Sequence, residues 1–139
     1  ISQLAAKLST ARHFDNACLI KEYTMQTPAF LKGHTIEVEE VAPGMSRQML
    51  GFNNEIMMVK VFFEEGAQGY LHAHRHSQVT YIESGEFEVT VGDSAETLGP
   101  GDCFFMEPHA PHGAICKKAG VLIDVFSPMR EDFLKEGVS

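Results

Sequence analysis

The stretch GYLHAHRHSQVTYIESGE (residues 69–86) decides how the fold is read, because four side chains able to bind a metal ion fall within seven positions. His72, His74, His76 and Gln78 share one parity, so a straight β-strand would direct all four to the same face. Six residues of straight strand span roughly 20 Å, whereas the ligands of one ion, bound at about 2.1 Å, must lie within a few ångströms of each other. The stretch can therefore be half of a metal site only if the chain bends in the Arg-His-Ser segment between His74 and Gln78.

With that bend, His72 and His74 end one strand and Gln78 begins the next, so that three donors can converge. A fourth donor can come from the segment PHAPH, which offers His109 and His112. His76 is expected to be a bend residue that faces solvent rather than a fifth ligand, and His109 to make a hydrogen bond or line the mouth of the site. An ordinary polar strand that is rich in histidine remains the alternative.

Outside this stretch, short apolar or alternating runs predict β-strands from about residue 36 onward. Gly, Pro, Asn and Asp separate the runs and mark turns such as Ser84-Gly85, Gly92-Asp93 and Pro100-Gly101. About eight strands at this regular spacing are typical of an antiparallel sandwich or a jelly-roll barrel. The runs are SRQMLGF (46–52), EIMMVKVFFE (55–64), QVTYIE (78–83), EFEVTVG (86–92), CFFMEP (103–108), HGAICK (112–117) and VLIDVF (121–126).

Both ends of the chain are expected to contain helix. Residues 1–23 lack Gly and Pro and have a loosely helical apolar spacing, and MREDFLKEG (129–137) predicts one short helix ended by Gly137. We therefore divide the chain into an N-terminal extension, partly helical, over residues 1–35 and a single all-β domain with a C-terminal helix over residues 36–139. The apolar positions of the first helix are Leu4, Ala5, Leu8 and Ala11.

Length and composition narrow the class of protein. A chain of 139 residues has the size of one domain, and it contains no run near the roughly 18 apolar residues that a membrane span needs. A net charge of -8 with a single basic pair, Lys117-Lys118, argues against a nucleic-acid partner. The three cysteines are an odd number without CxxC spacing, which favours the reducing cytoplasm.

The wider spacing around the histidines resembles the two motifs of the cupin superfamily. The first motif runs from Gly66 to Gly85, and the second runs from Gly101 to about Cys116. The resemblance covers roughly residues 45–127 and implies the cupin double-stranded β-helix, a jelly-roll barrel. Transferred residue by residue, it implies one divalent transition metal ion (Ni, Mn, Zn, Co or Fe) bound by His72, His74, Gln78 and His112.

Gln78 departs from the usual cupin motif, which has glutamate at this position. An amide oxygen contributes no negative charge, so a divalent ion bound here would keep more of its charge and be a stronger electrophile toward an anionic substrate. The set also differs from the carboxylate-containing ligands typical of non-haem iron oxygenases. The alternative is that Gln78 is only a polar residue at the end of a strand.

A second cluster of candidate residues lies near the C-terminus, in VLIDVFSPMRED (121–132). Asp124 and Phe126 share a face of the last strand, and an unpaired acid among strand-forming apolar residues is costly to bury. Asp124 is a candidate general acid or base, and Phe126 is a candidate for packing or for stacking against a sugar ring. Arg130 is a candidate for binding a substrate carboxylate through two parallel hydrogen bonds. The alternatives are a structural hydrogen bond for Asp124 and, for Arg130, a salt bridge with Glu131 or Asp132.

Taken together, HAHRHSQVTYIESGEFEVTVG, EPHAPHG and DVFSPMREDFL resemble one cupin family, the KdgF family of pectin degradation. The match runs through most of residues 45–134. It implies a metal-dependent enzyme of isomerase type that linearises the 4,5-unsaturated monouronates released by pectate and alginate lyases to 5-keto-4-deoxyuronate. It also implies that Asp124, Phe126 and Arg130 are the active-site residues. A homodimer is expected, and the alternatives are a cupin dioxygenase or a non-catalytic sugar-binding cupin.

Overall fold

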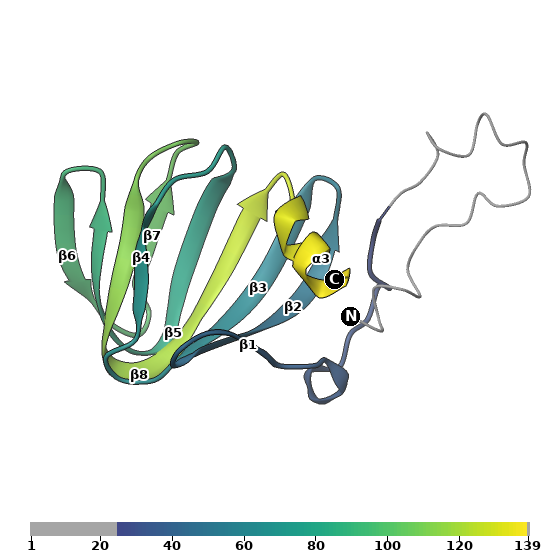
Figure 1. Ribbon diagram of the computed structural model, residues 1–139, viewed down its shortest axis with the longest axis horizontal. Helices are drawn as coiled ribbons and strands as arrows, with labels where there is room; N and C mark the ends of the chain where they lie inside the picture. The colour runs from purple at the N-terminus through teal and green to yellow at the C-terminus, as the bar shows by residue number, and fades with distance from the viewer. Residues whose placement is uncertain (1–24, 139) are drawn as a thin grey trace, which may run out of the picture.

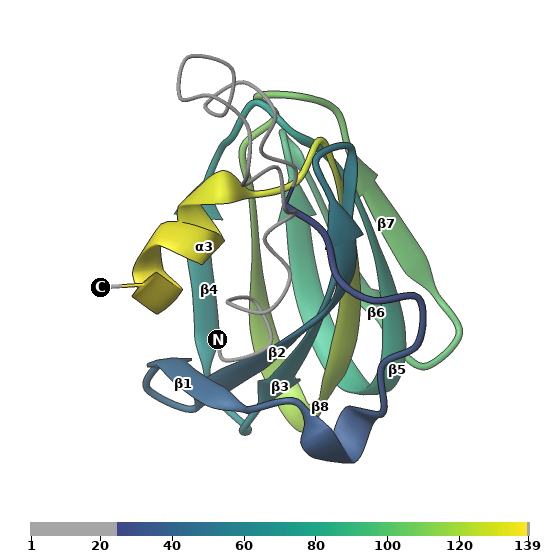
Figure 2. The ribbon, with the colours of Figure 1, turned by 90° about the vertical axis from the view of Figure 1, so that its right-hand side faces the viewer.

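The computed structural model describes residues 25–138, so the helix expected over residues 1–23 lies outside the described part of the chain. The described residues form eight antiparallel strands, one 3-10 turn and a C-terminal helix, and the sheet curls into a barrel (Figures 1 and 2). The predicted all-β barrel is confirmed. The elements are η1 (Gly33–Thr35), β1 (Glu39–Ala42), β2 (Met45–Asn53), β3 (Ile56–Phe63), β4 (Gln68–His72), β5 (Ser77–Val91), β6 (Ser94–Leu98), β7 (Cys103–Met106), β8 (His112–Ser127) and α3 (Glu131–Val138).

Two long strands, β5 and β8, form the spine of the barrel. They pair along almost their whole length, from Ser77 opposite Ser127 to Val91 opposite His112. The remaining strands add to this pair, with the order β1-β2-β3-β8-β5-β6, β4 on β8, and β7 on β5. Because both spine strands curl with the barrel, residues from the two ends of β8 can border one interior space.

The spine bends where β5 and β8 come closest. Gly85 has a positive φ of 90°, and a Cβ on Gly120 would lie 2.5 Å from the Gly85 Cα. Only glycine fits a contact this close. The pairing register shifts on both sides of Ser84, which marks a β-bulge. The sequence prediction of a turn at Ser84-Gly85 between two separate strands is therefore wrong, because the glycine lets one strand bend without ending.

The barrel interior is filled by alternate residues of its strands. In β3 the buried side chains are every second residue, from Met57 to Phe63, as the period of a half-buried strand requires. The same alternation places Ile82, Leu122 and Phe126 inside. Fully or nearly buried apolar side chains from four strands thus form one core: Phe52, Met57, Val59, Val61, Phe63, Ile82, Phe87, Val89, Leu122 and Phe126.

Three short strands, β1, β4 and β6, were not among the predicted runs, although β4 corresponds to the strand that was expected to end at His72 and His74. β4 and β6 are mostly exposed, so they lack the apolar alternation that identifies a strand in sequence. Helix α3 agrees with the predicted C-terminal helix, but it includes Gly137 in its last turn instead of ending before it. Leu134 of α3 joins the core, and the Phe133 ring of α3 packs against the guanidinium of Arg47 on β2.

The segment before β1 lies along β2. The backbone N–H of Thr27 donates to the Phe52 carbonyl at 3.0 Å, and the Gln48 side chain donates to the carbonyls of Gly33 at 2.9 Å and Ile36 at 3.0 Å. Within residues 25–138, no helix has the length and apolar character needed to cross a membrane.

Candidate metal centre and active site

Two neighbouring histidines, His72 and His74, meet the distant His112 in the barrel. His72 is the last residue of β4, His74 lies in the connection to β5, and His112 is the first residue of β8 and the register partner of His72. One ring nitrogen from each lies within 4.8 Å of the other two. The bend that the sequence required between His74 and Gln78 is present, since β5 begins at Ser77.

Hydrogen bonds to the backbone fix the ring orientation of all three histidines. Each Nδ1 lies close to a carbonyl oxygen two residues away in the chain, at 2.8 Å for His72, 3.1 Å for His74 and 2.9 Å for His112. A carbonyl only accepts, so each Nδ1 carries the proton and each Nε2 presents a lone pair. The Nε2 of His112 is buried and has no hydrogen-bond partner, which is the condition of a nitrogen placed to bind a cation.

Gln78 brings a fourth donor atom to the same point. Its side chain is buried near the start of β5, and its Oε1 lies 2.9 Å from the Nε2 of His74. Because the His74 Nε2 presents a lone pair, this distance brings two acceptors together, which repel each other unless a proton or a metal ion lies between them. The donor set therefore fits a divalent transition metal ion bound by nitrogen and neutral oxygen.

Burial favours the neutral form of the His74 and His112 imidazoles, which is the form that binds metal. Desolvation lowers the pKa of His112 to about 4 and is also the main cause that lowers the pKa of His74. The positive charge of Arg130 acts in the same direction on both rings. Neutral histidine is the form that binds a metal ion, so His74 and His112 need not lose a proton before they bind one.

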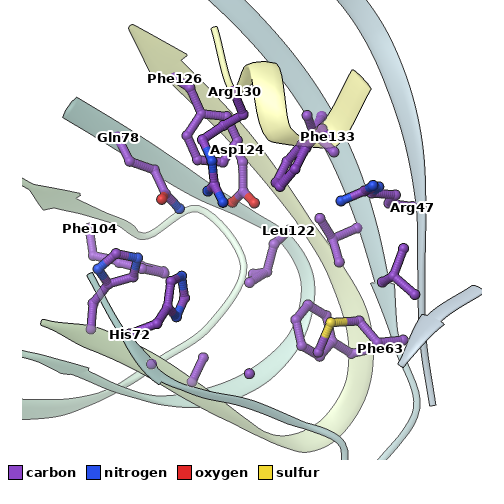
Figure 3. A pocket seen from close by; sticks show the side chains of 18 residues that line it. Arg47, Phe63, His72, Gln78, Phe104, Leu122, Asp124, Phe126, Arg130 and Phe133 are labelled. Carbon is purple, nitrogen blue, oxygen red and sulfur yellow. The ribbon is translucent and has the colours of Figure 1, made fainter. Parts of the chain in front are cut away.

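Asp124 faces this donor set from β8. It lines a pocket of about 210 Å³ together with His72, Gln78 and His112, and Figure 3 shows the side chains of Gln78, Asp124 and Arg130 pointing toward one another. Desolvation raises the pKa of the Asp124 carboxyl to about 6, against the opposing effect of a hydrogen bond from Thr80. A carboxyl group with such a pKa can both give and take a proton near neutral pH.

Arg130 and Phe126 lie beside Asp124, as the sequence predicted, but the structure limits their roles. Phe126 is only 2% exposed, which favours the packing role over sugar stacking. The Arg130 guanidinium lies 5.2 Å from the centre of the Phe126 ring and makes two contacts with the Asp132 carboxylate, at 3.0 and 2.8 Å. The salt bridge considered as the alternative for Arg130 is thus present, and it does not exclude binding a second anion, since a guanidinium has five N–H donors.

The two histidines of uncertain role differ from each other. His76 is 5% exposed, so the expectation that it faces solvent is wrong; its Nε2 lies 3.1 Å from Glu131, which also pairs with Arg75. These contacts fix the bend to the start of α3. His109 is exposed, and its backbone N–H donates to the His74 carbonyl at 2.6 Å.

Thr80, Arg47 and Phe133 are among the residues at the pocket that sequence reasoning did not identify. Thr80 bridges Gln78 and Asp124, while Arg47 and Phe133 line the pocket, with the Arg47 guanidinium 4.0 Å from the centre of the Phe133 ring. Arg47 could have been found from its parity, because it stands between Met45 and Met49 on the inward face of β2. Phe133 gave no such signal.

Comparisons with known proteins agree with this architecture. Residues 59–126 match the family model of the cupin domain. The chain is 39% identical over 98 residues to the pectin degradation protein KdgF of Dickeya dadantii (strain 3937), which covers 69% of this chain and 89% of that relative.

Two solved structures extend the comparison to three dimensions. An RmlC-like cupin from Shewanella frigidimarina NCIMB 400 is 54% identical with a TM-score of 0.76, covering 78% of this chain and 97% of that chain. KdgF from Halomonas sp. is 36% identical with a TM-score of 0.74, covering 77% of this chain and 99% of that chain. The chain is a cupin, and it belongs to the KdgF family.

Proposed function

We propose that this protein binds one divalent transition metal ion through His72, His74, Gln78 and His112 and opens the ring of 4,5-unsaturated monouronates to give 5-keto-4-deoxyuronate. Its relative from Dickeya dadantii is named a pectin degradation protein, which supports a substrate from that class of polysaccharide. The observation that carries the proposal is the placement of an acid, Asp124, and a cation, Arg130, on the same pocket as the metal-binding set.

The reaction needs proton transfer but no other reagent. In the cyclic substrate the ring oxygen joins the anomeric carbon to the unsaturated carbon C5. Ring opening removes the proton of the anomeric hydroxyl, turns that C–O bond into the aldehyde carbonyl, and breaks the bond between the anomeric carbon and the ring oxygen. The electron pair of the broken bond stays on the oxygen as an enolate, and protonation at C4 gives the ketone. Substrate and product are isomers.

Asp124 is suited to the proton transfers in this sequence. A carboxyl with a pKa of about 6 is ionised in part at neutral pH, so it can accept the hydroxyl proton and then deliver a proton to C4. Asp124 lies on β8 at the pocket wall, two residues before the buried Phe126, and desolvation raises its pKa more than the nearby positive charge of Arg130 lowers it.

The pocket also has to bind an anion in an acidic protein. The net charge of -8 repels a uronate in general, so the attraction must be local. Arg130 supplies one positive charge at the pocket, and its planar guanidinium matches a carboxylate. A bound divalent ion would add positive charge that stabilises the negative charge developing on oxygen during ring opening.

The test is the loss of ultraviolet absorbance of the conjugated unsaturated acid, followed with monouronates freshly released by a lyase. Because the ring also opens without enzyme, rates are compared with a protein-free blank. We expect acceleration by metal-loaded protein, loss of acceleration after chelation, and recovery after adding back a divalent ion. Equal rates with and without chelator would refute the metal-dependent mechanism.

Other outcomes identify the alternatives. A uronate that raises the melting temperature without forming product indicates a non-catalytic sugar-binding cupin. Oxygen consumption with a candidate substrate indicates a dioxygenase. The homodimer expected from the sequence stays a prediction, which light scattering on the eluting protein tests directly.

A further inference from the structure

Thr80 lies between the metal-binding set and Asp124. It is completely buried on β5, two residues after Gln78 and on the same face, and it is the register partner of Asp124 on β8. The Gln78 Nε2 donates to the Thr80 hydroxyl at 2.9 Å, and the Thr80 hydroxyl donates to the Asp124 Oδ1 at 2.7 Å. Three side chains from two strands thus form one continuous hydrogen-bond chain.

The direction of this chain follows from the groups at its ends. An ionised carboxylate only accepts, so the single hydroxyl proton of Thr80 points to Asp124. The hydroxyl oxygen is then left to accept, and the group that donates to it must be the amide nitrogen of Gln78. The amide oxygen consequently faces His74, where its lone pair can bind a cation.

An amide needs such a constraint, whereas a carboxylate does not. The two ends of a glutamine amide have nearly the same shape, but only the oxygen has a lone pair to offer a metal ion. If both the metal ion and the Thr80 hydroxyl were absent, the reversed amide would be favoured, because its NH₂ could donate to the lone pair on the His74 Nε2. The usual glutamate of the cupin motif has two equivalent oxygens and can present either one.

We propose that Thr80 is a positioning residue that holds the Gln78 amide with its oxygen toward the metal site, using Asp124 as the fixed acceptor. This inference rests on the proposed metal site and goes beyond it, because it gives Asp124, the proposed acid, a second role in orienting a metal ligand. Partners of this kind, one step removed from the metal, typically change metal affinity by about 10- to 100-fold.

The central experiment compares metal affinity in two backgrounds. Thr80→Val keeps the size of the side chain and removes the hydroxyl, and affinity is measured by competition with a chromogenic chelator for Co²⁺ or Zn²⁺. In the chain with Gln78 we expect a loss of about 10-fold or more. In the Gln78→Glu background we expect Thr80→Val to change affinity much less, because the ligand no longer has a wrong orientation. A purely structural defect would lower affinity to the same extent in both backgrounds.

Controls separate a local effect from unfolding. Thr80→Ser keeps the hydroxyl and should restore most of the affinity lost in Thr80→Val. Thr90→Val makes the same change on β5 at a residue that does not line the metal pocket, and it should leave affinity unchanged. The melting temperature of each chelated sample reports folding. If Thr80→Val lowers the melting temperature, metal affinity is measured in both backgrounds at a temperature at which every variant is folded.

The outcomes are distinguishable from failure of the proposed function. If the unaltered protein binds no divalent ion, the metal site itself is wrong and the inference fails with it. If the unaltered protein binds metal and Thr80→Val binds it equally well, only the positioning role is refuted. Equal losses in the Gln78 and Gln78→Glu backgrounds also refute it.

Discussion

Replacing Arg130 with methionine tests whether this residue binds substrate or only completes a salt bridge. Methionine keeps an unbranched chain that can pack over the rings of Phe126 and Phe133, which lie 5.2 and 4.2 Å from the guanidinium carbon. The change therefore removes the charge while keeping most of the apolar contact. The pocket then loses the Arg130 guanidinium and, among the described residues, keeps only that of Arg47 to meet a uronate.

The expected size of the effect follows from the contact that is lost. A hydrogen bond to a charged group contributes about 1.5 to 3 kcal/mol, which corresponds to roughly 10- to 150-fold in kcat/KM. Arg130 is mostly buried, with 12% of its side chain exposed, so solvent screens the interaction little. We expect the loss mainly in KM if Arg130 holds the carboxylate equally in substrate and transition state.

The assay is the initial rate of absorbance loss at substrate concentrations below and above KM, and Asp132→Asn is the matched control. Asp132 makes both polar contacts to Arg130 but has half of its side chain exposed. If Arg130 binds the uronate, removing its competing anion should leave kcat/KM unchanged or raise it. If the two variants lose activity equally, the salt bridge is what matters, and the assignment of Arg130 to substrate is refuted.

Two further variants test the active site and the fold. Asp124→Asn should retain metal, because an amide oxygen can still accept from Thr80, yet its rate should fall by roughly 100-fold or more. Metal content and turnover are measured on one sample, and Asp93→Asn, at an exposed position, is the control. Normal turnover of Asp124→Asn would contradict the role of Asp124. Gly120→Ala should lower the free energy of unfolding by about 3 kcal/mol or more, because the added Cβ would lie 2.5 Å from the Cα of Gly85. Urea unfolding measures this free energy. Gly33→Ala is the control, because its added Cβ meets no atom within 4 Å.

The convergence of His72, His74 and Gln78 could be predicted because its information is local, whereas His112 was assigned from the resemblance to the cupin motif. His72, His74 and Gln78 lie within seven residues, and their common parity together with the limit on ligand separation requires a bend between them. The alternation of β3 likewise defines a strand and its buried face from eight residues alone. Such predictions hold because the period of a strand and the size of a metal site do not depend on the rest of the chain.

What the sequence missed depends on contacts between distant residues. His76 looked like a solvent-facing bend residue, but it is buried, and its Nε2 lies 3.1 Å from the carboxylate of Glu131, 55 positions later. Thr80 is an ordinary strand residue until the register of β5 and β8 sets it opposite Asp124, 44 positions later. Periodicity indicates which face of a strand is buried, but not which residue of a distant element lies opposite, so neither contact could be deduced from it.

Asp124 has two roles that place different demands on it. For proton transfer it must change its charge, and its burial, which raises its pKa to about 6, makes that change easy. For the orientation of Gln78 it needs only an oxygen that accepts from Thr80, and a protonated carboxyl still has one. The two roles are compatible because the hydrogen bond uses Oδ1, which leaves the second carboxyl oxygen to carry the proton. Asp124 can therefore gain and lose a proton while it keeps its hydrogen bond with Thr80, so that the Gln78 amide keeps its orientation.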